Sequence, residues 1–236
     1  MRDSDAAALG SEAASLAGSR RAAATATIAW LGAVLVLALT VHPGATAADQ
    51  LDPAIRAGSA WLDPVAAALN LLGQLPFWAA LVVLQAVLVR RRPWLALELV
   101  AVSAAAEGLS SVVRLVVDRP RPELAHATDL VIAAGFPSGH VARAVVFAAT
   151  TLVVVPWLQR HRGAWLVLGI GLVALMADAR LLASAHYASD TLGGALLGAA
   201  VVGVWSLVTR LRRAGAAAGP SSPGAPGGPS RGRPSR

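Results

Sequence analysis

The most informative stretch of this sequence runs from residue 179 to residue 190, between two apolar runs. It places a guanidinium (Arg180), an imidazole (His186) and a carboxylate (Asp190) within twelve residues. His186 and Asp190 are four positions apart, so on a helix they share a face. A carboxylate beside an imidazole fixes its tautomer and stabilises the ring when it becomes positively charged. The stretch is therefore suited to nucleophilic or acid–base chemistry.

Two earlier stretches carry further polar groups. Arg114 and Arg121 are seven residues apart, but Pro120 and Pro122 must break any helix between them. We therefore expect Arg121 to approach from a loop. Arginines within apolar surroundings are costly and are commonly functional. Arg119 instead fits the ordinary interfacial placement in which a long side chain reaches the membrane surface.

The third stretch is the tetrapeptide from Pro137 through Ser138 and Gly139 to His140. Gly139 lets a backbone approach a ligand closely. The stretch opens an apolar run, and the N-terminus of a helix offers free N–H groups to an anion. An ordinary helix cap is the alternative for these four residues taken alone.

The rest of the sequence predicts a membrane scaffold. Of its 236 residues, 56% are hydrophobic and 14% are charged, against roughly a quarter charged in a soluble domain. The apolar residues fall into runs of about the length that spans a bilayer. The sequence predicts an all-α polytopic bundle of six transmembrane helices over 22–41, 76–89, 94–117, 141–157, 164–183 and 191–208.

Other segments complete the expected domain organisation. Residues 22–210 form the membrane domain, with short interfacial helices after the first span, one of them beginning at Asp63 and ending near Gly73. Residues 1–21 are expected to be a disordered cytoplasmic tail, and 211–236 a disordered tail rich in Pro, Gly and Arg. A cleaved signal peptide is the alternative for the first apolar run.

Arginine clusters predict the orientation of the bundle. They precede the first span and follow the second, fourth and sixth, so all lie on one face, which the positive-inside rule makes cytoplasmic. Both termini are then cytoplasmic, and the three polar stretches meet on the outer face. The basic residues serve topology, so we expect the lipid bilayer and no nucleic acid as a partner. Oligomeric state is not predicted.

The assembled groups make an oxyanion site, because guanidiniums match phosphate oxygens in bidentate fashion. There is no cysteine, and a metal centre is not required. Together the three stretches resemble the tripartite signature of the type 2 phosphatidic acid phosphatase (PAP2) superfamily. The resemblance rests on Arg114-x6-Arg121-Pro122, Pro137-Ser138-Gly139-His140 and Arg180-x5-His186-x3-Asp190. Two positions depart from the pattern: Arg114 replaces the usual Lys, and Ala179 replaces Ser.

The resemblance implies catalysis without a cofactor or metal. His186 would attack phosphorus to form a phosphohistidine, Asp190 would orient His186, and His140 would act as acid and then as base. Arg114, Arg121, Arg180, Ser138 and Gly139 would hold the phosphate oxygens. The substrate would be a lipid phosphate or diphosphate: polyprenyl (undecaprenyl) diphosphate, favoured by analogy, phosphatidate or phosphatidylglycerophosphate.

Two further residues are candidates for the same site. Arg143 lies one helical turn after His140 and is predicted to contact a second phosphate or a lipid head group, with pairing to an acid as the alternative. Glu107 lies two turns before Arg114 and is interpreted mainly as the partner of an arginine. Alternatives for the whole chain are a transporter or scaffold without catalysis and a vanadate-dependent haloperoxidase-like enzyme.

Overall fold

A computed structural model describes residues 3–41, 49, 54, 58, 61, 63–122 and 134–217. Every regular element within these residues is a helix, which confirms the predicted all-α class. The helices with described bounds are α1 (Asp3–Val41), α3 (Asp63–Leu72), α4 (Leu75–Leu88), α5 (Pro93–Val117), α6 (Gly139–Val154), α7 (Pro156–Arg160), α8 (Arg162–Leu182) and α9 (Ala188–Ala217).

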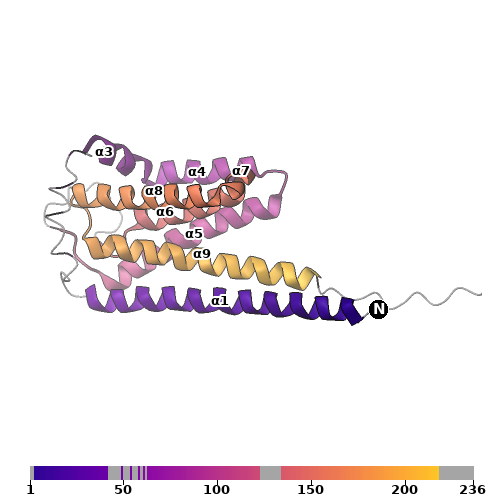
Figure 1. Ribbon diagram of the computed structural model, residues 1–236. Coiled ribbons are helices and arrows are strands. Elements are labelled where there is room, and N and C mark those ends of the chain that lie inside the picture. The colour runs from indigo at the N-terminus through magenta and orange to yellow at the C-terminus, as the bar shows by residue number, and fades with distance from the viewer. Residues whose placement is uncertain are drawn as a thin grey trace, which may run out of the picture.

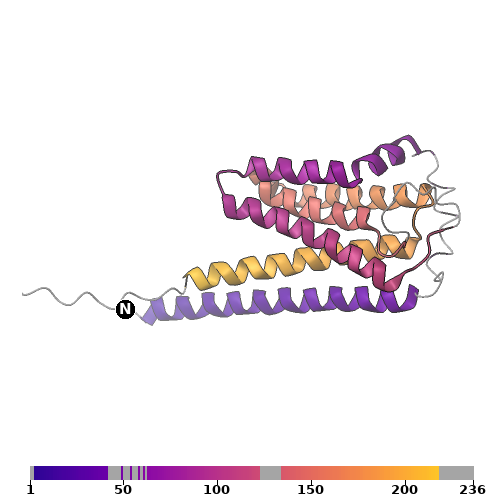
Figure 2. The same cartoon turned by 180° about the vertical axis from the view of Figure 1, so that it is seen from behind.

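The helices run side by side as one elongated bundle. Helix α1 packs along α9, and α6 packs against α5, α8 and α9. The beginning of α1, the turn between α4 and α5, helix α7 and the end of α9 lie at one end (Figures 1 and 2). Helix α3 and the start of α6 lie at the opposite end. We call these the arginine-rich end and the α3 end.

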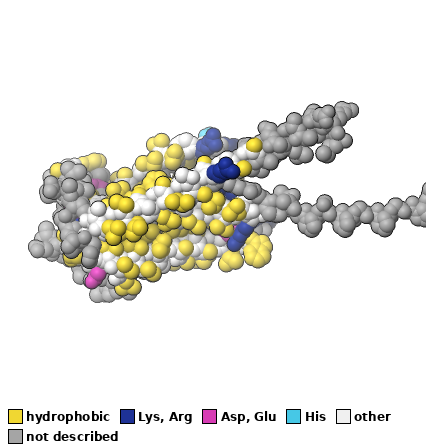
Figure 3. All heavy atoms as spheres, turned by 90° about the horizontal axis from the view of Figure 1, so that it is seen from below, with side chains coloured by type: hydrophobic (Ala, Val, Ile, Leu, Met, Phe, Trp, Pro, Cys, Tyr) yellow, Lys and Arg dark blue, Asp and Glu magenta, His cyan; other side chains and the backbone are white. Residues whose placement is uncertain are grey.

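Within the described residues, four helices are long and apolar enough to cross a membrane: Ala24–Val41 within α1, then α5, α8, and Ala188–Arg212 within α9. Helices α4 and α6 are equally apolar but shorter, with 14 and 16 residues. Large apolar side chains cover the outside of the bundle, as the space-filling view shows between its two ends (Figure 3). This surface suits a multi-pass membrane protein, and the six-span arrangement stays a prediction.

Three predicted boundaries differ from the structure. Helix α1 begins at Asp3, where a disordered tail over 1–21 was expected, because alanine is the strongest helix former and this segment is rich in it. Helix α9 continues through Ala217, so the expected tail starts later, and 218–236 lie outside the described residues. Helix α6 ends at Val154 because Pro156 cannot continue it.

Helix α3 begins at Asp63 and ends at Leu72, in agreement with the sequence. Its interfacial position stays a prediction. Most of the segment before it, including 42–48 and 50–53, lies outside the described residues.

Close contact between α6 and α9 sets the geometry of the α3 end. A Cβ on Gly194 of α9 would come within 2.3 Å of the Ser138 carbonyl oxygen at the start of α6. Only glycine allows this approach, as small residues do at helix interfaces in membranes. A buried apolar cluster joins α4, α5, α6 and α9 towards the other end; its members are Trp78, Val82, Val102, Ala106, Val146 and Val201. The two contacts together fix where α6 begins relative to the first turn of α9.

Candidate active site

The structure brings all three polar stretches to the α3 end of the bundle. Each comes from the end of a helix or from the loop beside it. Arg114 is in the last turn of α5, and Arg121 follows that helix. Ser138 caps α6, and Gly139 and His140 begin it. Arg180 is in the last turn of α8, His186 is in the α8–α9 loop, and Asp190 is in the first turn of α9.

His186 and Asp190 form the centre of this arrangement, and both side chains are buried. Oδ2 of Asp190 lies 3.6 Å from Nδ1 of His186, within ion-pair range but longer than a hydrogen bond. The same Oδ2 accepts a hydrogen bond from the Tyr187 backbone N–H at 2.9 Å. The carbonyl of Asp190 accepts from the Ser138 N–H at 2.9 Å, which ties α6 to α9. Asp190 is therefore placed to orient Nδ1, and Nε2 is the nitrogen left for bond formation.

The surroundings of His186 keep its ring neutral. Burial lowers the pKa of His186 to about 4, with Arg180 and Arg121 adding to the decrease and Asp190 opposing it. At neutral pH the imidazole therefore carries a free lone pair, which a nucleophile requires.

A second group of charges surrounds the start of α6. The Glu107 carboxylate lies between two arginines, 3.3 Å from Arg114 Nη2 and 3.5 Å from Arg143 Nη1. Arg114 also donates to Ser111 Oγ at 3.0 Å, and its buried Nε has no hydrogen-bond partner among the described residues. A Cβ on Gly139 would lie 3.1 Å from Arg114 Nη1. Glu107 thus holds two cations beside the backbone that opens α6.

His140 lies between Arg143 and the turn that joins α3 to α4. Nη2 of Arg143 is 3.4 Å from His140 Nδ1, and Nε of Arg143 donates to the Gly139 carbonyl at 3.1 Å. His140 Nε2 is buried without a hydrogen-bond partner in the described part of the chain. A Cβ on Gly73 would fall 2.2 Å from His140 Cδ2. The ring therefore rests on Gly73, a contact that the sequence did not predict.

Gly73→Ala is expected to lower kcat by about 10²-fold, because the added methyl overlaps the imidazole of His140 and a displacement of about 1 Å in a catalytic group has an effect of this size. Steady-state turnover by the purified protein measures the change in kcat. Gly171→Ala is the matched control, since a Cβ there meets nothing within 4 Å. Equal activity of the two variants would contradict the proposed contact.

The remaining predicted residues lie around the same space. A Cβ on Gly135 would meet both Asp190 Oδ2 at 3.0 Å and Arg121 Cγ at 3.5 Å, which places Arg121 beside the His186–Asp190 pair. The Ser138 hydroxyl is buried and has no hydrogen-bond partner among the described residues. An oxyanion bound among these side chains would give a hydrogen-bond partner to that hydroxyl and to the buried nitrogens Arg114 Nε and His140 Nε2.

Sequence reasoning missed Asn70. Its Oδ1 accepts from Arg180 Nη1 at 3.2 Å, and its Nδ2 donates to the Ala179 carbonyl at 3.3 Å. Asn70 therefore braces Arg180 at the position where the family pattern has a serine and this chain has Ala179. A lone amide among the apolar residues that follow Pro64 in helix α3 is the signal that could have found it.

Arg119 was interpreted wrongly. It does not extend to the membrane surface, because its side chain is fully buried and paired with both Asp49 and Asp190. Snorkelling requires the guanidinium to reach the membrane surface, and here the guanidinium is held inside by two buried carboxylates.

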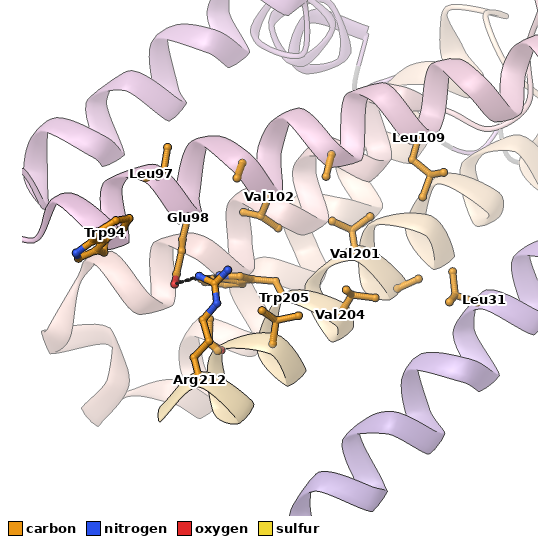
Figure 4. A pocket seen from close by; sticks show the side chains of 15 residues that line it. Leu31, Trp94, Leu97, Glu98, Val102, Leu109, Val201, Val204, Trp205 and Arg212 are labelled. Carbon is orange, nitrogen blue, oxygen red and sulfur yellow. Dashed lines mark hydrogen bonds and ion pairs between the residues drawn. The ribbon is translucent and has the colours of Figure 1, made fainter. Parts of the chain in front are cut away.

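A groove about as large as a ligand pocket lies elsewhere in the bundle. It has a volume of about 620 Å³ and lies between α5 and α9, with Leu31 of α1 at one side (Figure 4). Its lining is apolar except near Trp205, where Glu98 pairs with Arg212 at 3.3 Å. None of the predicted site residues lines it, and it is not part of the candidate active site.

The bundle has membrane-length helices, and buried histidines and arginines lie at its α3 end, an arrangement typical of a multi-pass membrane protein with a site for an oxyanion. Residues 95–214 match the family model of the PAP2 superfamily, and the chain belongs to that superfamily. The match includes all the predicted site residues.

Two comparisons agree with this membership. The chain is 27% identical to phosphatidylglycerophosphatase B of Bacillus subtilis (strain 168) over 176 residues, which are 70% of this chain and 85% of that protein. Its fold is similar to the crystal structure of a transmembrane PAP2-type phosphatidylglycerolphosphate phosphatase from Bacillus subtilis. That similarity has a TM-score of 0.66 at 23% identity and covers 78% of this chain and 96% of the other. The protein is therefore an enzyme, a phosphatase that acts on phosphate esters.

Proposed function

We propose that this phosphatase hydrolyses lipid phosphates or diphosphates through a phosphohistidine at His186. The observation that carries the proposal is the convergence of His186, Asp190 and His140 with several arginines at one end of an apolar bundle. A site at the end of membrane-length helices suits a substrate whose head group is polar and whose tail stays in lipid. Polyprenyl diphosphate, phosphatidate and phosphatidylglycerophosphate are the candidate substrates.

The reaction has two steps. Nε2 of His186 attacks the terminal phosphorus, the bond from this phosphorus to the oxygen of the lipid alcohol or lipid monophosphate breaks, and that leaving oxygen takes a proton from His140. His140, now neutral, removes a proton from water, whose oxygen attacks phosphorus and breaks the P–N bond. Inorganic phosphate leaves, and both histidines return to their starting states.

Charge in both transition states develops on the equatorial phosphate oxygens. Arg180, Arg121 and Arg114 supply fixed cationic donors for them, with the Ser138 hydroxyl and the Gly139 backbone beside them. Donors held in place before the reaction stabilise this charge without reorganisation. The phosphate dianion in turn supplies the negative charge that favours the imidazolium form of His140.

The decisive experiment is phosphate release by the purified protein in detergent micelles. The panel comprises farnesyl diphosphate, dioctanoyl phosphatidate and dioctanoyl phosphatidylglycerophosphate, each with chelator. We expect turnover of at least one of them and inhibition by vanadate, which resembles the five-coordinate phosphorus. No release from any of the three would overturn the proposal, and the ranking of their kcat/KM values identifies the substrate class.

Arg143→Ala is expected to lower kcat/KM for farnesyl diphosphate about 10- to 100-fold more than for farnesyl phosphate, because a charge-assisted contact to the second phosphate is lost. The two substrates share one tail, so their ratio isolates the added phosphate. Arg212→Ala is the matched control, since Arg212 pairs with Glu98 at the far end. Equal losses on both substrates would rule out a role for Arg143 in reading a diphosphate.

We further propose that the arginine-rich end is cytoplasmic and the candidate site faces outwards. The turn at Arg90, Arg91 and Arg92 and the arginines of α7 and α9 lie together at one end, as the positive-inside rule requires of a cytoplasmic face.

The natural chain has no cysteine, so single reporters can test this orientation. In intact cells, an impermeant maleimide is expected to label Asp118→Cys at the α3 end and to leave Arg91→Cys unlabelled until the membrane is opened. Both positions are exposed. The reverse labelling pattern would show that the site faces the cytoplasm.

A further inference from the structure

A buried cluster of charges lies directly behind the His186–Asp190 pair. Arg119, whose side chain has no exposed surface, is 2.5 Å from Asp190 Oδ1 through Nη1 and 2.7 Å from Asp49 Oδ2 through Nη2. Its guanidinium also lies over the ring of Tyr187, 4.3 Å from the ring centroid. Arg119 thus joins two carboxylates that are far apart in the sequence.

Ser189 links the same groups a second time. Its hydroxyl accepts from Arg119 Nη1 at 2.6 Å and donates to Asp49 Oδ1 at 2.7 Å. Its backbone N–H donates to the same Asp49 oxygen at 3.1 Å. Asp49 therefore fixes the chain immediately before Asp190, while Arg119 holds the Asp190 carboxylate itself.

The two carboxylate oxygens of Asp190 face different partners. Oδ1 is occupied by Arg119, and Oδ2 is directed towards Nδ1 of His186 at 3.6 Å. Rotating the carboxylate would separate a fully buried ion pair, which is strongly unfavourable where no water can replace the lost partner. The orientation of Asp190 is consequently set by Arg119 at Oδ1, together with the Tyr187 N–H at Oδ2, and not by the histidine that it faces.

We infer that Arg119 and Asp49 are positioning residues that hold Asp190 against Nδ1 of His186. The inference deepens the proposed function, because it concerns how the nucleophile of that reaction is oriented. Arg119 contacts Asp190 directly and Asp49 contacts Ser189 before it, so both would act through Asp190.

The charges of Arg119 and Asp49 explain why both residues are needed beside Asp190. Arg119 alone would neutralise Asp190, which would then stabilise a positive His186 poorly. Asp49 binds the same guanidinium, so Arg119 is shared between two carboxylates and Asp190 keeps more of its negative charge beside the ring. That charge stabilises the imidazole as it gains a bond to phosphorus and becomes cationic.

Two measurements on Arg119→Gln, Arg119→Lys and Asp49→Asn test the inference in the full-length protein. The first is steady-state kinetics on farnesyl diphosphate and dioctanoyl phosphatidate. We expect Arg119→Gln to lower kcat about 10²-fold with KM changed less than about 3-fold, because orientation is lost and phosphate contacts are kept. Asp49→Asn should lower kcat about 10-fold, Arg119→Lys should regain part of the loss, and the double variant Asp49→Asn/Arg119→Gln should resemble Arg119→Gln.

The second measurement is the ¹⁵N NMR spectrum of the histidine rings, which does not depend on turnover. The wild-type His186 ring is expected to carry its proton on Nδ1, facing Asp190. Arg119→Gln should convert it to a mixture of both tautomers. The Gln85→Leu variant is the control for general loss of stability, because Gln85 is buried and bonds Thr150 and Thr151 far from the site. It should keep the Nδ1–H tautomer.

The two measurements distinguish a failure of this inference from a failure of the proposed function. If the wild-type protein releases no phosphate, the proposed function fails, and the tautomer of His186 still decides the role of Arg119. Wild-type kcat together with an unchanged His186 tautomer in Arg119→Gln would overturn the inference. So would a rise in KM with constant kcat, which would place Arg119 on the phosphate.

Discussion

Replacing His186 with glutamine is expected to lower kcat by at least about 10⁴-fold, because the first step loses its nucleophile and no other group can form the covalent intermediate. His186 is the imidazole whose Nδ1 faces Asp190 and whose neutral form is favoured by burial. Phosphate release from the best substrate of the panel measures the loss. Glutamine keeps the volume of the buried side chain close to that of histidine.

The control for this variant is His161→Gln. His161 is exposed and lies between α7 and α8, at the arginine-rich end. It should retain wild-type activity. Intact-protein mass spectrometry at alkaline pH, where phosphohistidine survives, adds a second reading: the wild-type protein should gain one phosphoryl group during turnover, and His186→Gln should gain none. Turnover by His186→Gln near the wild-type rate would remove His186 as the nucleophile.

Replacing His140 with asparagine is expected to lower kcat on lipid phosphates about 10²- to 10⁴-fold, the range for loss of a general acid–base group. Its Nε2 is buried without a partner among the described residues and is the atom available to the leaving oxygen. The size of the loss should depend on the leaving group, because an aryl phosphate such as p-nitrophenyl phosphate departs without protonation.

This dependence gives His140 a signature that separates it from His186. With p-nitrophenyl phosphate, His140→Asn should still form the phosphoenzyme but hydrolyse it slowly, since water is no longer activated. The phosphoryl mass should therefore accumulate in His140→Asn and be absent from His186→Gln. An equal loss on lipid and aryl substrates, with no accumulated phosphoenzyme, would mean that His140 acts in binding and not in proton transfer.

Much of the fold follows from local features of the sequence. The apolar runs predicted the bounds of α4, α5 and α8 to within two residues. In lipid a single segment can satisfy its backbone N–H and C=O groups only as a helix, so the length of an apolar run sets the length of the helix. The errors have local causes as well. Pro156 ends α6 early, and alanine-rich composition extends α1 back to Asp3.

The sequence also determined which polar stretches belong together. Arg114, His140 and His186 each lie at a helix end, and counting the spans places those ends on one side of the bundle. The structure brings them to the α3 end without distorting any helix. Their roles stay predictions, supported by membership of the PAP2 superfamily.

Only the tertiary structure decided how these residues are supported. The contacts of Asp49 with Ser189, of Asn70 with Arg180 and of Gly73 with His140 join segments separated by tens of residues or more. Hydrophobic periodicity and helix propensity describe neighbours along one helix, and they carry no information about contacts between distant segments. Arg119 shows the consequence, because its charge alone predicts exposure, and only the presence of two carboxylates on other segments makes its burial favourable.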